Sequence, residues 1–275
     1  MELLKRIISA IILIPAVIGT VIWGVLPTIV LAEVVCILMM IDVTSALKKG
    51  GFKPNRIVLV TTAALMLPAV LYQGTNGYFL LSAISFSIMA ACVILSKRPD
   101  FKTLLSGAFA LVYPLIPASL LVLLCTMDLS RNERFGMILV IGAIVCACFS
   151  DTFAYFFGKF FGKRKLCPQI SPKKTIFGSF GSFVGGVFGG FISYLFLNMV
   201  ADIIPVHHWL IMGFLCGGFS QIGDLTASML KRFCDVKDFG NYIPGHGGIM
   251  DRMDSISTCL IAIVAYVQIF VEKLL

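Results

Sequence analysis

The segment Gly223–Ser255 has the sequence GDLTASMLKRFCDVKDFGNYIPGHGGIMDRMDS and lies between two long apolar runs. Charged residues make up only 13% of the chain, yet this segment concentrates acids, bases and a histidine. These residues are Asp224, Asp235, Asp238, Asp251, Asp254, Lys231, Arg232, Lys237, Arg252 and His246. Acids interleaved with bases can hold a metal ion and a polyphosphate together. Charge beside a membrane-spanning run usually has a functional or topological role, so we interpret the segment as a candidate site.

Helical spacing predicts how the first residues of this segment are arranged. If the apolar run that starts near Trp209 continues as a helix through Lys231, then Asp224, Ser228 and Lys231 recur at i, i+4 and i+7. Residues with this spacing share one face of a helix. An acid, a hydroxyl and an ammonium group on one face would line a polar cleft.

A glycine-rich turn follows this predicted helix. Gly245, Gly247 and Gly248 allow the backbone to turn sharply and to approach a ligand closely, as phosphate-binding loops do. Asp251 and Asp254 are three residues apart, so both carboxylates can face one metal ion if a helix begins there. The same pair also suits the positive end of a helix dipole without any metal, and the spacing leaves both interpretations open.

The composition predicts an all-α, polytopic integral membrane protein. The 275 residues are 59% hydrophobic with a mean hydropathy of +0.98, and a spanning helix needs about 20 mostly apolar residues. We expect about nine transmembrane helices in a single domain, 1–275, with little motif content in 1–130 and the site in 131–275. The expected spans are Ile7–Trp23, Leu26–Ala46, Ile57–Tyr72, Tyr78–Leu95, Leu104–Met127, Phe135–Phe157, Ile176–Val200, Trp209–Met229 and Ser255–Phe270.

The N-terminal run lacks a convincing signal-peptidase site, so we expect it to be retained as the first helix. With a cytoplasmic N-terminus and nine spans, all but three of the 22 lysines and arginines fall on the cytoplasmic side. This asymmetry follows the positive-inside rule, so the net charge of +8 indicates topology and not nucleic-acid binding. We therefore expect the site to face the cytoplasm of a bacterial-type inner membrane. The nine cysteines lie mostly in apolar runs and indicate neither a disulfide framework nor a zinc site.

Two acids interrupt the apolar sequence of the predicted second span. Glu33 could line a polar cleft or pair with another helix for structural reasons. Asp42 lies nearer the cytoplasmic end, where it could snorkel or pair with Lys48 or Lys49. In the predicted seventh span, glycines recur at intervals of about four residues, and we expect that face to be a helix-packing seam.

The charged segment closely resembles the signature of the phosphatidate cytidylyltransferase family, also called CDP-diacylglycerol synthases. The matching residues are Ser228, Lys231, Arg232, Lys237, Asp238, Gly240, Pro244, Gly245, His246, Gly247, Gly248, Asp251, Arg252 and Asp254. The signature is long, irregularly spaced and rich in rare residue types, so a chance match is very improbable. The resemblance covers roughly the second half of the chain, whereas the first half matches only in hydrophobicity and length.

Two segments upstream extend this resemblance. Asp151, Thr152, Ala154 and Tyr155 match a family segment, although this chain has Phe153 where the family usually has glycine. The run Ser171–Thr175, SPKKT, matches a second segment, in which lysines beside hydroxyl groups are suited to binding phosphate oxygens. The family commonly has a glutamate before the next glycine, and here Phe177 takes that place.

The resemblance implies that CTP and phosphatidate react to give CDP-diacylglycerol and pyrophosphate with Mg²⁺ as cofactor. A phosphate monoester is already anionic at neutral pH, so its attack on the α-phosphorus of CTP would need positioning and charge neutralisation more than a strong general base. The expected metal ligands are Asp224, Asp251, Asp254 and Asp151. The expected catalytic residues are Asp224, Lys231, Arg232, Lys237, Asp238, His246 and Arg252. The expected substrate-binding residues are Ser171, Lys173, Lys174, Thr175, Ser228, Gly245, Gly247 and Gly248.

Two other functions remain open at this point. A CDP-alcohol phosphotransferase also uses membrane-embedded aspartates, but its D-G-x-x-A-R … G-x-x-x-D-x-x-x-D pattern is absent from the sequence. A secondary transporter would show an inverted repeat with charges near the membrane midplane, whereas here the charges cluster at one face. The expected partners are CTP, phosphatidate and membrane lipid, with a homodimer as a further expectation and no nucleic acid.

Overall fold

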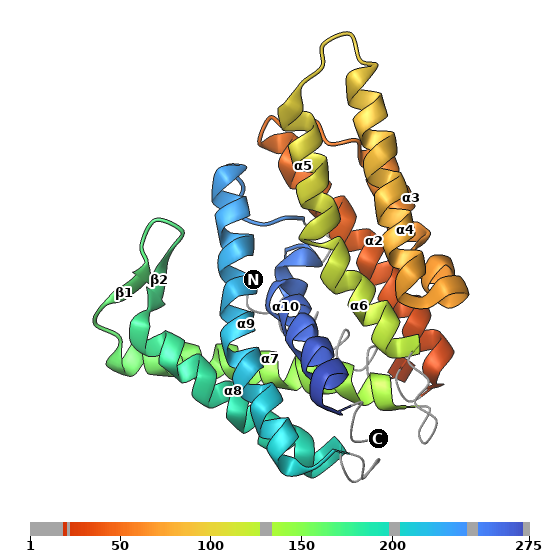
Figure 1. Ribbon diagram of the computed structural model, residues 1–275. Coiled ribbons are helices and arrows are strands. Elements are labelled where there is room, and N and C mark those ends of the chain that lie inside the picture. The colour runs from red at the N-terminus through yellow and green to blue at the C-terminus, as the bar shows by residue number, and fades with distance from the viewer. Residues whose placement is uncertain (1–18, 21–22, 127–133, 198–203, 241–246, 272–275) are drawn as a thin grey trace. The chain divides into compact units, whose positions relative to one another are not determined.

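The structure is a computed structural model that describes residues 19–20, 23–126, 134–197, 204–240 and 247–271 (Figure 1). Nearly all of the predicted first span, Ile7–Trp23, lies outside these residues, as do Gly245 and His246. The helices are α2 (Val25–Lys49), α3 (Arg56–Ala64), α4 (Met66–Ile94), α5 (Phe101–Val112), α6 (Leu115–Thr126), α7 (Phe135–Phe161), α8 (Ile176–Leu197), α9 (Val206–Phe233) and α10 (Met250–Tyr266), with a π-helical turn at Val267–Val271. Two strands, β1 (Lys165–Cys167) and β2 (Ser171–Thr175), form a hairpin between α7 and α8.

The chain divides into two compact units, each built from two separate stretches. The first unit comprises Met1–Thr126 and Lys231–Met253, and the second comprises Met127–Leu230 and Asp254–Leu275. The predicted change in character near residue 130 falls at the first of these boundaries. The short stretch Lys231–Met253, which carries much of the charged segment, belongs with the N-terminal helices.

The core of the first unit forms around α2, which packs against α3 and α6. Met39, Met40 and Val43 of α2 are completely buried, as expected for a helix that is covered on several sides. Pro114 separates α5 from α6 because proline cannot continue the backbone hydrogen bonding of a helix. Pro68 lies in the first turn of α4, where a missing N–H group is tolerated.

The helix α4 folds back on itself at Gly74, which has φ 56° and ψ −136°. Such a backbone conformation is open to glycine but strained for other residues. The hydroxyl groups of Thr62 in α3 and Ser85 in α4 lie 2.6 Å apart, which a straight helix from Met66 to Ile94 could not allow. A Cβ atom added at Gly77 would overlap the carbonyl oxygen of Ala69, so the two arms also meet close to the reversal.

Seven helices in the described residues are long and apolar enough to cross a membrane. Six of them match predicted spans, with α5 and α6 counted together as Phe101–Thr126. The seventh is α4: the predicted span Ile57–Tyr72 falls on α3 and the first arm of α4, and Tyr78–Leu95 falls on the second arm. When α4 is counted as one spanning helix, the described residues contain seven candidate spans, and the expected total of nine is not reproduced. The prediction of a mostly helical chain with several membrane-spanning helices is confirmed.

In the second unit, α8 packs through its glycines against α7 on one side and α9 on the other. A Cβ atom added at Gly185 would lie 2.7 Å from Cβ of Phe153 in α7. One added at Gly186 would lie 2.9 Å from the backbone nitrogen of Gly217 in α9. Real Cβ atoms essentially never approach so closely, so side chains at these positions would push the helices apart. The predicted packing seam is confirmed, and it has two faces.

The β-hairpin is the part of the fold that the sequence did not predict. Lys165 pairs with Thr175 and Cys167 with Ser171 in an antiparallel register. At the base of the hairpin, next to α7 and α8, the backbone N–H of Ile176 donates to the carbonyl oxygen of Arg164, at 3.0 Å. The predicted all-α fold contained no strands, and these two strands are too short to show an alternating pattern.

Candidate functional site

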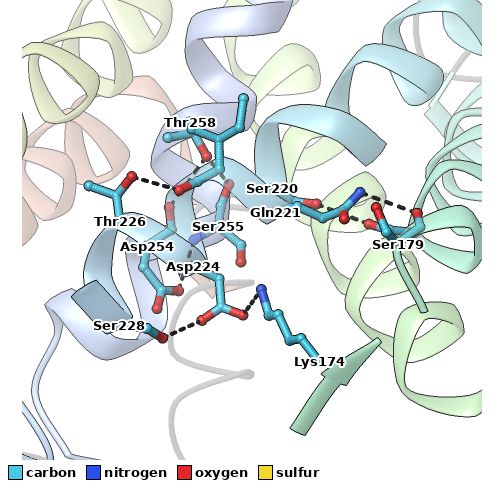
Figure 2. A network of polar contacts seen from close by, with 12 residues as sticks. Lys174, Ser179, Ser220, Gln221, Asp224, Thr226, Ser228, Asp254, Ser255 and Thr258 are labelled. Atoms are coloured by element: carbon cyan, nitrogen blue, oxygen red, sulfur yellow. Dashed lines mark hydrogen bonds and ion pairs between the residues drawn. The ribbon is translucent and has the colours of Figure 1, made fainter. Parts of the chain in front are cut away.

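An ion pair between the hairpin and α9 forms the centre of one polar cluster. Lys174, from β2, pairs through Nζ with Oδ2 of Asp224 (Figure 2). The other oxygen, Oδ1, accepts a hydrogen bond from the Ser228 hydroxyl one turn later, at 3.4 Å. The side chains of Lys174 and Asp224 are 25% and 32% exposed, so both remain accessible to a ligand. This arrangement, together with Asp151 described next, is called the hairpin cluster below.

A second carboxylate lies near this ion pair. Asp151, in α7, is close enough to Asp224 and Lys174 to interact electrostatically with both, and the Ser255 hydroxyl donates a hydrogen bond to it. At Asp151, repulsion by the Asp224 carboxylate outweighs attraction by the Lys174 ammonium group. The hairpin cluster is therefore suited to a further cation, or to a ligand whose phosphate engages Lys174 while a cation engages the acids.

The start of α10 packs against α9 directly behind Asp224. A Cβ atom added at Gly223 would lie 3.0 Å from the carbonyl carbon of Asp254, so only glycine permits this approach. The Thr258 hydroxyl fixes the contact by donating to the carbonyl oxygen of Phe219, at 2.7 Å. Asp254 itself is buried, and its Oδ1 accepts a hydrogen bond from the backbone N–H of Ser255, at 2.8 Å.

On the other side, α9 is tied to α8 by the amide of Gln221. Its Nε2 donates to the carbonyl oxygens of Ser179, at 3.2 Å, and Gly217, at 2.8 Å (Figure 2). Because Gln221 lies one turn before Asp224, this bond fixes the helix close to the candidate site. The sequence reasoning missed both Gly223 and Gln221, although a glycine beside a charged residue in an apolar helix is a usable signal for close packing.

The SPKKT run contains residues with different environments. Lys173 is exposed, whereas Lys174 makes the ion pair and Thr175 is buried. The Thr175 hydroxyl accepts a hydrogen bond from the backbone N–H of Gly178, at 3.1 Å. Since α8 begins at Ile176, Thr175 is the N-cap of that helix. The predicted substrate-binding residues of this run thus include a capping residue.

In the first unit, Asp251 is the centre of a second arrangement, called the turn cluster below. Its Oδ1 lies 2.7 Å from Nζ of Lys231. Its Oδ2 accepts hydrogen bonds from the backbone N–H groups of Phe239, at 2.8 Å, and Gly248, at 3.0 Å. Lys231 also lies over the Phe239 ring, 5.3 Å from its centroid. The Asp251 and Lys231 side chains are only 5% and 16% exposed. This buried carboxylate links the end of α9, through the Lys231 side chain, to the backbone at Phe239 and at Gly248.

The turn cluster depends on glycine at one position because of backbone conformation. Gly247 has φ +80°, and a Cβ atom there would lie 2.8 Å from Oδ2 of Asp251. A larger residue would be strained and would also displace the carboxylate. Gly247 and Gly248 therefore let the chain fold around Asp251, which is the sharp turn that the sequence predicted.

The end of α9 directs the following loop back towards Asp251. The backbone N–H of Val236 donates to the carbonyl oxygen of Lys231, at 2.9 Å, and that of Asp235 donates to Arg232, at 3.2 Å. Together with φ 51° at Asp235, these bonds form a Schellman motif. The predicted phosphate-binding residues of this loop, Arg232 and Lys237, are exposed, as is Asp238. Arg252 is also exposed and makes an interaction of its own.

Cys234 lies in the same loop and packs against Gly50, whose added Cβ atom would be 2.9 Å from the Cys234 Cα. Burial raises the pKa of the Cys234 thiol, so it stays protonated and unreactive at neutral pH. Phe233 stacks on Phe52 at a centroid distance of 5.2 Å. These contacts secure the end of α9 to the loop between α2 and α3.

Asp42 contacts the turn cluster, and the sequence analysis gave it no role there. Its Oδ2 accepts a hydrogen bond from the backbone N–H of Met250, at 3.0 Å, and the residue is 1% exposed. Neither predicted partner, Lys48 or Lys49, makes an ion pair with it among the described residues. The two bonded residues are 208 positions apart, so no local pattern could have linked them.

The acids of the hairpin cluster fit Mg²⁺ better than Asp251 does. Mg²⁺ in phosphate-transferring sites is held by one or two carboxylates, with substrate oxygens and water completing the octahedron. Asp224 and Asp151 provide such a pair, and the partners of Asp224, Lys174 and Ser228, are side chains that can rotate away. Asp251, in contrast, is held by two backbone N–H groups as well as by Lys231. No group of three or more histidine, cysteine or acidic side chains suited to a metal is found in the part of the chain that the structure describes.

Comparisons with known proteins give a consistent result. A family model described as the cytidylyltransferase family matches residues 4–270. A phosphatidate cytidylyltransferase from Bacillus subtilis (strain 168) is 42% identical over 129 residues, which is 46% of each chain. One from Staphylococcus aureus (strain COL) is 36% identical over 177 residues, covering 64% of this chain and 63% of that one. One from Staphylococcus saprophyticus is 35% identical over 205 residues, or 74% of each. The chain thus spans about half to two thirds of the length of the first two relatives.

Proposed function

The chain belongs to the cytidylyltransferase family, and we propose that it transfers the cytidylyl group of CTP to phosphatidate, giving CDP-diacylglycerol and pyrophosphate. The observation that carries this proposal is the hairpin cluster, in which an accessible lysine of β2 meets carboxylates from the C-terminal halves of α7 and α9, two candidate membrane-spanning helices. A lipid that carries a phosphate can approach these helices from the bilayer, and a nucleotide can approach the β-hairpin from the water.

Lys174 and Asp224 are suited to exchange partners when substrate binds. Both are partly exposed, and an ion pair in that setting is worth little, so replacing it by contacts to the ligand costs little. The Lys174 ammonium would then donate to a phosphate oxygen through a charge-assisted hydrogen bond. Asp224, relieved of Lys174 and oriented by Ser228, would together with Asp151 hold Mg²⁺, which when bound would neutralise phosphate charge.

Residues around the hairpin cluster would orient the reacting groups. No strong general base is required, because the attacking lipid phosphate is already an anion at neutral pH. The rate would instead depend on how well the attacking oxygen and the leaving pyrophosphate are aligned. The packing of α10 on Gly223 and the Gln221 bond to α8 fix the helix that carries Asp224, so its carboxylate is held in place before substrate arrives. We also keep Lys231, Arg232, Lys237 and Arg252 as candidates for phosphate binding.

We further propose that the candidate site faces the cytoplasm. The β-hairpin that carries Lys174 is itself basic, with Lys163, Arg164, Lys165 and Lys173 beside it. In the first unit, the reversal at Gly74 returns α4 to the end where α3 began. Two groups of basic residues therefore lie at the same end of this unit. One group precedes α3 and its continuation into α4 (Lys48, Lys49 and Arg56), and the other follows α4 (Lys97, Arg98 and Lys102). Basic loops collect on the cytoplasmic side of a membrane. Counting the two arms separately adds one to the seven candidate spans, and the predicted first span would bring the total to nine.

The experiment that tests the reaction uses the purified full chain with labelled CTP and phosphatidate in detergent or vesicles. We expect Mg²⁺-dependent incorporation of label into lipid, with release of pyrophosphate. A CDP-alcohol phosphotransferase would instead release CMP from a supplied CDP-lipid, and a transporter would form no new lipid. Either of these results, without label incorporation from CTP, would overturn the proposal.

A further inference from the structure

The buried acid Asp42 needs a physical explanation because of where it lies. It is in the C-terminal third of a largely apolar helix, α2, and is 1% exposed. Its Oδ1 has no hydrogen-bond partner, and no lysine or arginine forms an ion pair with the residue in the described part of the chain. An acid in such a position destabilises the fold by several kcal/mol unless another group compensates.

The first turn of α10 provides that compensation. The first backbone N–H groups of a helix have no acceptor within the helix, and its N-terminus carries a partial positive charge. Met250 is the first residue of α10, and its N–H donates to Oδ2 of Asp42. A contact between the carboxylate and the N–H of Ile249 adds to this. Asp42 thus caps α10 from another helix, in the way that a local aspartate usually does.

The same oxygen of Asp42 fixes the position of the glycine turn. A Cβ atom added at Gly248 would clash with Oδ2 of Asp42 and would lie 2.8 Å from the backbone nitrogen of Gly240. The N–H of Gly248 points instead to Asp251, at 3.0 Å. The turn is therefore held between two carboxylates, Asp42 on one side and Asp251 on the other.

We propose that Asp42 is a positioning residue for the transfer reaction, which fixes the glycine turn and thereby Asp251 and its partner Lys231. This rests on the proposed function only where activity is the readout. Asp42 does not touch substrate in this proposal. It acts through the first turn of α10, so its loss would let the turn and the Lys231 ammonium take up many orientations.

The chain offers a matched control in Glu33, nine residues earlier in the same helix. Glu33 is 8% exposed, its Oε1 accepts a hydrogen bond from the backbone N–H of Leu67 at 3.2 Å, and its Oε2 has no partner in the described part of the chain. It therefore has the same chemistry as Asp42, with one oxygen on a backbone N–H and one unpaired. Its contact is with α4 and not with the turn. If removing a buried carboxylate were enough to lower kcat, substitutions of Glu33 and Asp42 should lower it equally. If Asp42 positions the glycine turn, only its substitution should do so.

The activity test compares Asp42→Ala with Glu33→Ala, each corrected for the amount of folded protein. We expect Asp42→Ala to lower kcat by about tenfold or more while the KM for CTP changes by less than about threefold, and Glu33→Ala to leave kcat within about twofold. Asp42→Asn keeps an acceptor oxygen for Met250 and should retain clearly more kcat than Asp42→Ala. It also serves as the test if the alanine variant does not fold. Equal kcat in Asp42→Ala and wild type, or Asp42→Asn as slow as Asp42→Ala, would overturn the proposal.

A second measurement separates this proposal from the proposed function. Hydrogen exchange at residues 248–252 reports on the turn whether or not the protein makes CDP-diacylglycerol. We expect exchange there to be about tenfold faster or more in Asp42→Ala and unchanged in Glu33→Ala. If wild type is inactive with CTP but shows this pattern, the function fails and the positioning role stands. If exchange in Asp42→Ala equals that in wild type, the positioning role is wrong even in an active enzyme.

Discussion

The hairpin cluster and the turn cluster each contain an aspartate paired with a lysine, but the two aspartates have different surroundings. Asp224 of the hairpin cluster is 32% exposed, and its hydrogen-bond and ion-pair partners in the described part of the chain are two side chains, Lys174 and Ser228. Asp251 of the turn cluster is 5% exposed and binds two backbone N–H groups as well as Lys231. Side-chain partners can rotate away when a ligand arrives, whereas backbone N–H groups cannot leave without unfolding the loop.

This difference indicates that two aspartates with similar sequence surroundings have different roles, one in binding ligands and one in holding the backbone. An accessible carboxylate with exchangeable partners is suited to binding a cation or responding to phosphate. A buried carboxylate that bridges backbone segments is suited to holding a loop in one conformation. The two clusters therefore respond differently to the same substitution, which the following experiments exploit.

Asp224→Asn should give the largest loss of activity. Asparagine preserves size and can still accept from Ser228, so the fold should survive, but the charge available to a cation is lost. We expect the rate of CDP-diacylglycerol formation to fall on the order of 10²-fold, as when a strong electrostatic group is removed from a transition state. Raising Mg²⁺ should restore part of the activity by mass action.

A matched control for this substitution is Asp235→Asn, because Asp235 is exposed and its φ of 51° is tolerated by asparagine. We expect that variant to keep activity within about twofold, since the Asp235 side chain takes no part in the hydrogen bonds and ion pairs described for either cluster. If Asp224→Asn were as active as Asp235→Asn, the hairpin cluster would have no part in the chemistry.

Asp251→Asn should give a smaller loss of turnover together with a loss of stability. Removing one member of a buried ion pair leaves Lys231 with an uncompensated charge, which destabilises by about 3 kcal/mol. We expect a lower melting temperature and turnover reduced on the order of 30-fold per folded molecule, because the turn is displaced. Extra Mg²⁺ should not restore it. Restoration by Mg²⁺ with an unchanged melting temperature would instead make Asp251 a metal ligand, as the sequence motif alone predicts.

The sequence predicted the parts of these clusters that follow a local pattern. Asp224, Ser228 and Lys231 recur with helical period in an apolar run, and α9 does continue through Lys231. The glycine turn was predicted because Gly247 and Gly248 adjoin charged residues, and Gly247 does have a backbone conformation that favours glycine. In both cases the physical cause lies within a few residues, so the pattern carries the information.

The sequence could not predict contacts made between distant segments. Asp42 and Met250 are 208 positions apart, and neither neighbourhood indicates the other. Asp251 was assigned to metal because it lies beside the glycine turn and three residues before Asp254, and only the fold brings Phe239 to it. The sequence predicted a reversal between the spans Ile57–Tyr72 and Tyr78–Leu95, but not that the backbone conformation of Gly74 would produce it. Thr175 is a missed local signal, since a threonine before an apolar run is a common N-cap.

Neighbouring lysines of the hairpin give an intermediate test of the comparison. Successive residues in a strand point to opposite faces, so Lys173 and Lys174 have the same charge but different surroundings. We expect Lys174→Ala to lower kcat/KM for CTP by about tenfold, the loss of one charge-assisted hydrogen bond. Lys173→Ala should change it by less than about threefold. Equal effects of the two substitutions would show that the hairpin acts through its overall charge and not through the Lys174–Asp224 pair.

Thr175→Ala should have the smallest effect, and it would show where the hairpin cluster ends. The family resemblance places Thr175 among the substrate-binding residues, whereas the structure engages its hydroxyl with the N–H of Gly178 and buries it to 5% exposure. Losing an N-cap costs about 1 kcal/mol of stability. We therefore expect a melting temperature lower by a few degrees, with kcat and the KM for CTP within about twofold of wild type. Thr175→Ser, which keeps the capping oxygen, should restore the melting temperature. If Thr175→Ala lowered kcat about tenfold without changing the melting temperature, the hydroxyl would have to leave Gly178 and bind substrate during turnover, and the hairpin cluster would extend to the start of α8.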